Sequence, residues 1–268
     1  MGLPVHALII MSTPRFFYPA TLQANQHVEL PQSMAHYALR VLRLKAGAEI
    51  VLFDGQGGEY PARLDCHAKQ ATAVTGEHDP REAELAGRIT LIQGLASADK
   101  MDWIIEKAVE LGAYRVVPIA AQRSVLQLRG ERLDKRLQHW RRIAQSASEQ
   151  CGRNRIMEVD GVHTLKAFLE RPAPASYSTT LLCHPGGGIT LQQALCEFPE
   201  IRGSDVDVEP PVLNLMVGPE GGWSEAELAL ADQHGIRPIQ FGSRVLRTET
   251  AGLALISAST ALLDWDAA

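Results

Sequence analysis

The hydrophobic pattern divides the chain into two parts with different periods. Between residues 14 and 78, four short runs with β-branched or alternating apolar residues are separated by Gly and Asp, and they predict β-strands. A helix is expected between the first two strands, over 31–44, where apolar residues recur at helical spacing after Pro31. These elements predict a small β-barrel domain. Charged residues, Pro and Gly then interrupt the pattern, which indicates a linker near residues 78–86.

The second part of the chain alternates apolar runs with amphipathic segments. Strands are expected over 88–96, 114–120, 179–185, 211–218 and 237–242. Helices are expected over 99–112, 132–150, 191–198, 224–235 and 249–263. This alternation is typical of an α/β domain with a mainly parallel sheet. The predicted domains are therefore 11–80 and 86–268.

Composition and the ends of the chain add three expectations. With 46% hydrophobic and 21% charged residues, the chain resembles an ordinary soluble globular protein. The start lacks the basic region and cleavage site of a signal peptide, and no apolar run is long enough for a membrane span, so we expect a cytoplasmic protein. The four cysteines lie far apart without zinc-ligand spacing, which predicts reduced thiols and no metal site.

Basic residues are concentrated between Ala121 and Arg155. This stretch holds nine Lys or Arg residues against three Asp or Glu residues, a net charge of +6, whereas the whole chain has a formal net charge of −5. Such a strip on an acidic protein is typical of a polyanion-binding surface. The solvated face of an amphipathic helix gives the same pattern and is the commoner cause of an isolated charge run.

Three expected strands of the second domain end in loops suited to a ligand. These loops are Cys183–Gly188, Gly218–Gly222 and Phe241–Gly252, and ligands of open α/β sheets bind beyond the carboxyl ends of strands. The absence of GxGxxG after the first strand and of GxxxxGK[ST] disfavours NAD and ATP by their usual motifs. Backbone groups and apolar neighbours suit an adenine and a ribose, and Glu220 favours a cation. The alternative is that GPEGG is only a strand-to-helix turn, but three such loops in one domain favour a ligand.

Seven segments resemble the 16S ribosomal RNA uracil-N3 methyltransferase family of the SPOUT superfamily. They occur in the family's order, over nearly the whole chain from Met11. The segments are PRFFY, HYALRVLRL and GQGGEY in the first domain, and KMDWIIEKAVELGA, WRRIAQSASEQCGRNR, GPEGGWSEAE and GSRVLRTETA in the second. The departures are Trp223, where the family often has Phe, and GSDVDVEPP at 203–211, which resembles a loop insertion.

The resemblance implies a fold and an activity. The fold would be α/β, with a C-terminal SPOUT trefoil-knot domain after a PUA-like β-barrel that helps to hold RNA. The activity would be S-adenosylmethionine-dependent methylation of N3 of a uridine in the decoding-region helix near the 3′ end of 16S ribosomal RNA, within the small ribosomal subunit. The enzyme would be a homodimer whose knot loops bind the cofactor. The expected cofactor-binding residues are His184, Met216, Val217, Gly218, Pro219, Glu220, Gly221, Gly222, Phe241, Gly242, Val245, Leu246, Thr248 and Ala251.

Methylation of N3 poses a chemical problem that suggests candidate catalytic residues. N3 of neutral uracil carries a proton, which either a base removes or positive groups help to release by stabilising the anion. Arg247 is the first candidate for the second role, because an Arg stays charged at neutral pH. Asn154 and Arg155 are candidates for contact with the uracil edge or its phosphate. Two roles fit Glu249 equally well, positioning of Arg247 and capping of the last helix.

Several arginines are candidates for RNA binding. In the first domain Arg40 and Arg43 lie at i, i+3 on the expected helix, although each taken alone is more typical of a solvated surface. The expected RNA-binding residues are Arg15, Arg40, Arg43, Arg123, Arg141, Arg142, Arg153 and Arg155.

Three other functions remain as alternatives. A non-catalytic RNA-binding protein would not bind S-adenosylmethionine. An α/β enzyme acting on a small nucleotide metabolite would not show steeply salt-dependent RNA binding. A related methyltransferase would modify a ribose 2′-OH instead of N3.

Overall fold

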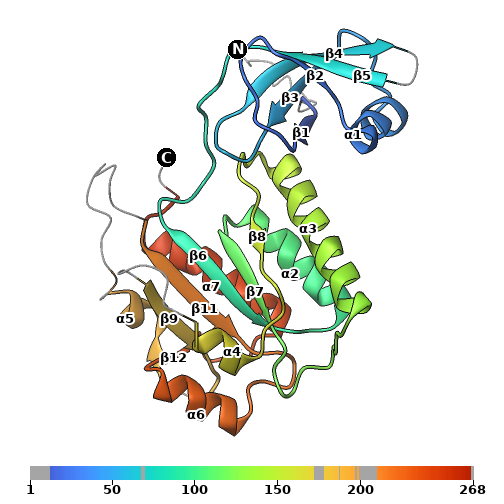
Figure 1. Cartoon of the computed structure of the whole chain (residues 1–268). Helices are drawn as coiled ribbons and strands as arrows, with labels where there is room; N and C mark the ends of the chain where they lie inside the picture. Colours follow the sequence, from blue (N-terminus) through green and yellow to red (C-terminus); the bar gives the residue numbers. More distant parts are fainter. Residues whose placement is uncertain are drawn as a thin grey trace, which may run out of the picture. The chain divides into compact units, whose positions relative to one another are not determined.

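The computed structural model describes residues 13–67, 70–171, 178–186, 188–196, 198 and 210–266. The chain divides into two compact units, Met1–Glu82 and Ala83–Ala268 (Figure 1). We refer to them as the N-terminal unit and the C-terminal unit. None of the described helices is long and apolar enough to cross a bilayer.

The N-terminal unit is built on a five-stranded sheet in the order β1-β3-β4-β5-β2. Its strands are β1 (Arg15–Phe17), β2 (His27–Glu29), β3 (Glu49–Phe53), β4 (Tyr60–His67) and β5 (Gln70–Thr75). Only the β1–β3 pair is parallel among these neighbours. The expected helix forms as α1 (Gln32–His36) and continues as a short π-helix, η1 (Tyr37–Val41). Ala35 and Ala38 pack against the apolar face of the sheet.

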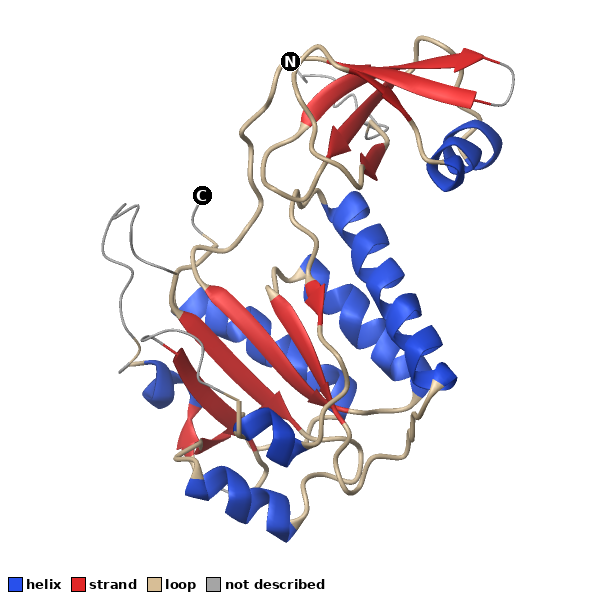
Figure 2. Cartoon of the chain, viewed as in Figure 1, coloured by secondary structure: helices blue, strands red, loops and turns tan. Residues whose placement is uncertain are grey.

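The C-terminal unit contains a seven-stranded, fully parallel sheet in the order β10-β12-β9-β11-β6-β7-β8 (Figure 2). Its strands are β6 (Arg88–Gly94), β7 (Arg115–Ile119), β8 (Glu158–Val159), β9 (Ser178–Cys183), β10 (Ile189–Thr190), β11 (Val212–Val217) and β12 (Arg237–Gln240). Strand β11 is buried along its whole length, as expected of a central strand covered on both faces. The predicted parallel α/β arrangement is confirmed.

Helices cover both faces of this sheet. They are α2 (Ala98–Glu110), α3 (Glu131–Cys151), α4 (Leu165–Leu169), α5 (Leu191–Leu195), α6 (Glu225–Gln233) and α7 (Thr248–Leu262). Side chains that alternate along each strand reach opposite layers. Leu91 belongs to the core cluster that includes residues of α2, α3, α5 and α7, whereas Ile92 belongs to the cluster that includes residues of α4 and α6. Figure 1 shows the helices on the two sides of the sheet. The trefoil knot implied by the resemblance stays a prediction.

The end of the described chain closes against the beginning of the C-terminal unit. Trp265 is buried, its ring lies 5.6 Å from that of Phe198, and its carbonyl oxygen accepts a hydrogen bond from the Ala86 N–H at 3.0 Å. A Cβ on Gly87 would lie 2.3 Å from the Trp265 ring. A glycine is therefore required where the two segments cross.

Candidate active site

A cavity of about 620 Å³ lies at the carboxyl ends of β9, β11 and β12. Its size is typical of a small-molecule site. The lining residues are Lys100, Arg123, Cys183, His184, Pro185, Val217, Gly218, Pro219, Glu220, Gly222, Trp223, Gln240, Phe241, Gly242, Ser243, Arg244, Val245, Leu246, Arg247, Thr248 and Ala251. The three glycine-containing loops singled out in the sequence therefore meet at one cavity.

A chain of hydrogen bonds connects β6, the Gly218–Gly222 loop and the start of α7. The fully buried Gln93 donates from Nε2 to Thr248 Oγ1 at 2.8 Å and to the Gly94 carbonyl at 2.9 Å. Thr248 Oγ1 donates in turn to the Gly218 carbonyl at 2.6 Å. Two walls of the cavity are thereby held in one geometry.

Close backbone approach explains some of the glycines. A Cβ on Gly94 would lie 2.5 Å from the backbone nitrogen of Pro219, so β6 has to end in glycine where the loop crosses it. A Cβ on Gly221 would lie 2.9 Å from Arg123 Cβ and 3.1 Å from the Arg123 carbonyl oxygen. Gly221 thus faces Arg123 and is not among the residues that line the cavity. Contact between Gly221 and the cofactor stays a prediction, and it would involve the backbone on the side away from Arg123.

Met216 is the other expected cofactor-binding residue that does not line the cavity. Its side chain is fully buried in the layer under α4 and α6, whereas the next residue, Val217, lines the cavity. The alternation of side chains along a strand explains the difference. The other twelve expected cofactor-binding residues do line the cavity. Whether they bind the cofactor stays a prediction.

Four charged side chains form a row, and three of them, Lys100, Glu220 and Arg247, line the cavity. Lys100 Nζ lies 3.2 Å from both Glu220 Oε1 and Glu249 Oε2, and Glu249 Oε1 lies 4.0 Å from Arg247 Nη1. The Arg247 side chain is 83% exposed, whereas that of Glu249 is mostly buried. Lys100 was not identified from the sequence, because its two partners are remote along the chain.

The charges in this row shift two pKa values. Burial raises the pKa of Glu220, but its own N–H, the Ser97 N–H and the Lys100 ammonium outweigh burial and bring this pKa below its ordinary value. Glu249 and Glu220 raise the pKa of Lys100 above its ordinary value. At neutral pH the cavity therefore presents an ionised Glu220 and a protonated Lys100.

Arg123 lies at the cavity rather than on the basic helix. Its Nη1 donates to the carbonyls of Gly221 and Trp223, both at 3.3 Å. Its neighbour Gln122 donates its N–H to Glu227 Oε1 at 2.9 Å, and Glu227 also forms the capping box of α6 with Ser224. The segment after β7 thus holds the end of the Gly218–Gly222 loop, which we call the glycine loop, through hydrogen bonds. The structure gives Arg123 this role beside its expected contact with RNA.

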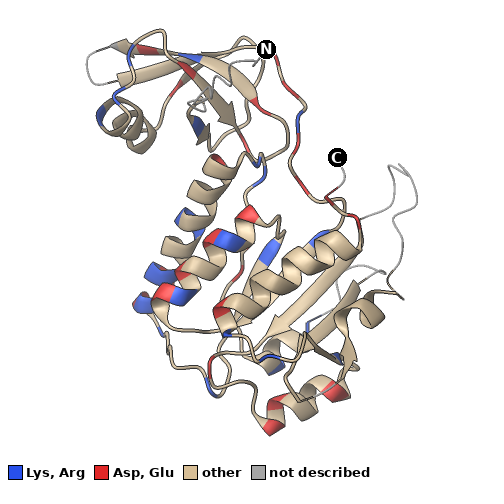
Figure 3. Cartoon of the chain, turned by 180° about the vertical axis from the view of Figure 1, so that it is seen from behind, with Lys and Arg blue, Asp and Glu red and all other residues tan. Residues whose placement is uncertain are grey.

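The basic strip separates into exposed and buried residues. Arg141 and Arg142 on α3 are exposed, as is Arg155 after the helix. Figure 3 shows Lys and Arg positions, coloured blue on the ribbon, along α3. These three arginines remain candidates for RNA binding.

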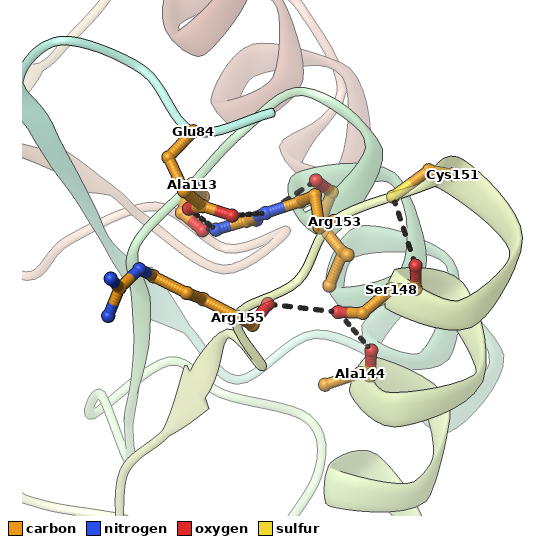
Figure 4. Close-up of polar contacts among 8 residues, drawn as sticks. Glu84, Ala113, Ala144, Ser148, Cys151, Arg153 and Arg155 are labelled. Atoms are coloured by element: carbon orange, nitrogen blue, oxygen red, sulfur yellow. Dashed lines mark hydrogen bonds and ion pairs between the residues drawn. The ribbon is translucent and has the colours of Figure 1, made fainter. Parts of the chain in front are cut away.

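Arg153 is buried, with its side chain 3% exposed. Its Nε and Nη2 donate to the two carboxylate oxygens of Glu84, and Nη1 donates to the carbonyls of Val109 and Ala113 at 3.1 and 2.8 Å (Figure 4). The guanidinium thus joins the beginning of the C-terminal unit to the end of α2. The expectation that Arg153 binds RNA is corrected to a structural role.

Asn154 is also fully buried and does not line the cavity. It follows Gly152, whose left-handed φ of 86° ends α3 and turns the next residues into the interior. The structure therefore gives no support to direct contact between Asn154 and a uracil.

In the N-terminal unit, Arg40 and Arg43 are exposed, but Arg15 is not. Arg15 pairs with Glu59, and its guanidinium lies 5.2 Å from the centre of the Phe53 ring. Burial raises the pKa of Glu59, but Arg15 and Arg81 outweigh it and bring this pKa below its ordinary value. Arg15 is thereby corrected from a phosphate contact to part of an internal ion pair.

Models of two protein families match the chain. A model described as an RNA methyltransferase domain matches residues 83–260, and one described as an RNA methyltransferase PUA domain matches residues 30–71. Ribosomal RNA small subunit methyltransferase E of Bacillus subtilis is 32% identical to the chain over 91% of its length and 94% of its own. The protein of that name from Synechocystis is 31% identical, over 88% of the chain and 74% of its own length.

Two solved structures are also similar to the chain. Ribosomal RNA small subunit methyltransferase E from Neisseria gonorrhoeae, bound to S-adenosylmethionine, has 35% identity and a TM-score of 0.81, over 94% of the chain and 98% of that structure. A structure described as that of a methyltransferase from Legionella pneumophila, with the bound cofactor S-adenosylmethionine, has 30% identity and a TM-score of 0.83, over 93% and 98%.

Proposed function

The chain belongs to the ribosomal RNA small subunit methyltransferase E family, and from this premise we propose that it methylates N3 of a uridine in 16S ribosomal RNA, using S-adenosylmethionine. The names of its relatives support small-subunit ribosomal RNA as the substrate class, and the solved relatives support the cofactor. The uridine in the decoding-region helix and its N3 atom come from the sequence resemblance and from the chemistry that follows.

The observation that carries the proposal is the convergence of the three loops at one cavity, with a row of charges beside it. The residues present fit the cofactor. Val217, Leu246 and Phe241 offer apolar surface for an adenine, and the ionised Glu220 complements a positive sulfonium. Within the described residues no cluster of His, Cys, Asp and Glu could hold a metal ion.

When bound, S-adenosylmethionine supplies an electrophilic methyl group on a positively charged sulfur. The chain has to present a uracil whose N3 has lost its proton or is losing it. Arg247 lies at the cavity and is largely exposed. Its planar guanidinium would stabilise the negative charge that develops on the uracil oxygens. The base itself has to leave its stack to reach this position.

Glu249 acts on Arg247 in this proposal. Its carboxylate lies between Lys100 and Arg247 at the start of α7. Lys100 anchors one oxygen, which leaves the other directed toward the guanidinium. Glu249 therefore positions Arg247 and does not itself touch the uracil.

The proposal includes a homodimer acting in the cytoplasm. Leu255 and Ile256 of α7 are buried in the unit's own core, so the apolar character of this helix is not by itself evidence for a dimer. Exposed Trp103 on α2 and Leu262 on α7 support an interface, because these two helices pack together. Light scattering at micromolar concentration should give the mass of two chains.

The function is tested by methylating purified small subunits that lack the modification, followed by mass spectrometry of the nucleosides. The expected product is 3-methyluridine, whereas 2′-O-methyluridine would overturn the assignment. Single-turnover rates should rise with pH, because the bound uracil loses its proton more readily. Activity should fall from wild type to Arg247→Lys and further to Arg247→Met, with little change in cofactor affinity. A rate unaffected by Arg247→Met would reject the mechanism but keep the function.

A further inference from the structure

The N-terminal unit exposes an apolar surface on its helical segment. Tyr37, Val41 and Leu42 are 48%, 55% and 38% exposed, and the neighbouring Arg40, Arg43 and Lys45 are exposed as well. We call these six residues the helical patch. The opposite side of the segment is occupied by Ala35 and Ala38, which pack in the core. Internal packing therefore explains the buried side, whereas much of the surface of Tyr37, Val41 and Leu42 faces solvent.

The backbone beneath the patch departs from ordinary helical geometry. The Leu42 N–H donates to the Tyr37 carbonyl at 3.0 Å, a bond from residue i+5 to residue i. Arg43 then has a φ of +56°, in the left-handed region that disfavours residues with a side chain. π-helical turns and left-handed residues are retained preferentially at functional sites. Here the π-helical turn and the left-handed residue lie in the segment that carries Arg40, Arg43 and the apolar residues of the patch.

The Tyr37 ring is already held in position. Its centre lies 6.4 Å from that of Phe16, at an interplanar angle of 82°, and Phe16 is buried. The Tyr37 ring thus contacts the core through Phe16 while about half of its surface meets solvent. A fixed aromatic side chain loses little conformational entropy when a ligand packs against it.

The charge around the patch has one sign. From Leu30 to Ala48 the sequence has Arg40, Arg43 and Lys45 but no Asp or Glu, in a chain whose net charge is −5. Aromatic surface next to Arg and Lys suits a partner with flat apolar groups joined by anionic links. Unpaired RNA has this chemistry, because its bases are free to stack while its phosphates stay accessible. A duplex exposes phosphates, 2′-hydroxyls and base edges, but its base faces are stacked inside the helix.

We propose that the helical patch binds an unpaired segment of the substrate RNA, with a base stacked against Tyr37 and phosphates paired with Arg40, Arg43 and Lys45. This inference rests on the proposed function for the identity of the RNA. It adds a recognition surface for single-stranded RNA that is separate from the cofactor cavity.

The test compares two RNA probes on the full-length protein. One is a short fluorescent oligouridine, and the other is a blunt-ended RNA duplex of the same length. Tyr37→Ala should weaken oligouridine binding by about tenfold, within the range measured for loss of one stacked base. Tyr37→Phe keeps the ring and should bind like wild type. Neither substitution should change the affinity for the duplex.

Two further variants keep the proposal falsifiable if Tyr37→Ala disturbs the fold. Val41→Glu places a negative charge on the most exposed apolar residue of the patch and should also weaken oligouridine binding. Arg43→Gly relieves the strain of the left-handed backbone, so it should keep the fold. The slope of the logarithm of affinity against the logarithm of salt concentration should become smaller by about one. Arg63, an exposed cation on β4, provides the matched control. Arg63→Ala should change the slope less than Arg43→Gly does.

Four outcomes would overturn the proposal. Tyr37→Ala could bind oligouridine as wild type does, or lose affinity for both probes equally. Arg63→Ala could have the same effect as Arg43→Gly, which would indicate diffuse attraction. A change of mass in light scattering with Tyr37→Ala would mean that the patch joins two copies of the chain. If the wild-type protein binds oligouridine through Tyr37 but forms no 3-methyluridine, the proposed function is wrong, and RNA binding by the helical patch is still supported.

Discussion

At position 221, the neighbouring Arg123 leaves no room for a side chain. It packs against Arg123, which holds two carbonyls of the glycine loop. The loop therefore keeps its shape only if residue 221 has no Cβ. This is a different requirement from a positive φ, which Gly221 does not have.

Gly221→Ala should displace Arg123 and lower the affinity for S-adenosylmethionine by about tenfold, equivalent to about 1.4 kcal/mol. Gly235 provides a control with the same substitution, because its φ is +67° and no atom lies within 4 Å of an added Cβ. Gly235→Ala should cost about 1 kcal/mol of stability but leave cofactor affinity unchanged. Calorimetry and thermal unfolding measure the two effects, and equal affinity in both variants would contradict the role of Arg123.

Lys100 should affect the choice between cofactor and product. The product of methyl transfer has lost the positive charge on sulfur. Lys100→Met removes a positive charge beside Glu220, so the preference for S-adenosylmethionine over S-adenosylhomocysteine should increase several-fold, whereas Lys100→Arg should keep the wild-type ratio. Calorimetric titration of both ligands gives the ratio, and an unchanged ratio in Lys100→Met would show that the row of charges does not sense the sulfur.

At the scale of elements, the sequence predicted the long helices of the C-terminal unit well because their faces are long and periodic. The short helix α4 was not expected, and the helix expected over 191–198 spans only Leu191–Leu195. The basic helix was expected over 132–150 and spans Glu131–Cys151. Strand β1 was not expected, since three residues carry too little pattern and its pairing with β3 is non-local. Strands β8 and β10, of two residues each, were absent from the prediction for the same reason.

The candidate site was predictable where the glycine loops mark it. The sequence could not show which way a side chain points, and this explains why the side chains of Met216 and Arg153 are buried and not at the surfaces expected for them. It also could not reveal Lys100, whose partners become neighbours only after the sheet has formed. Composition alone does not distinguish Arg153, which binds backbone carbonyls, from Arg142, which is exposed.

The end of α3 therefore predicts two distinct phenotypes. Arg153→Met leaves the half-buried Glu84 and two carbonyls without their partner, which should cost about 3–5 kcal/mol of stability. Arg142→Glu, on the exposed face, should change stability by only about 0.5 kcal/mol but weaken RNA binding and flatten its salt dependence.

Chemical denaturation and RNA titration at several salt concentrations measure these effects. The double variant Arg153→Met with Glu84→Leu should recover part of the lost stability, because it removes both partners of the pair. If Arg142→Glu proves as destabilising as Arg153→Met, the distinction between the two faces is incorrect.

At the scale of the whole molecule, the two units have separate hydrophobic cores. Units of this kind often unfold as separate transitions. Each should therefore respond to its own ionisable groups. In the N-terminal unit the relevant group is Glu59, which both Arg15 and Arg81 contact.

Glu59 should make the N-terminal unit sensitive to acid. Its pKa is below the ordinary value of 4.5 in the folded state, so its stabilising effect is present above the unfolded pKa and is lost as pH falls through the folded pKa. Glu59→Gln should cost about 2 kcal/mol at neutral pH, and the difference from wild type should shrink below the unfolded pKa. Unfolding measured against pH tests this, with the exposed Glu29→Gln as control. A difference that stays constant with pH would contradict the assignment.

The contact between Trp265 and Ala86 makes the C-terminal unit a closed cassette. Its first and last segments hold each other through residues that all lie after Ala83. Domain exchange at this point would give the same methylating module a different RNA-binding partner. Any such fusion has to retain Glu84 for Arg153, and a shortened chain has to extend past Trp265.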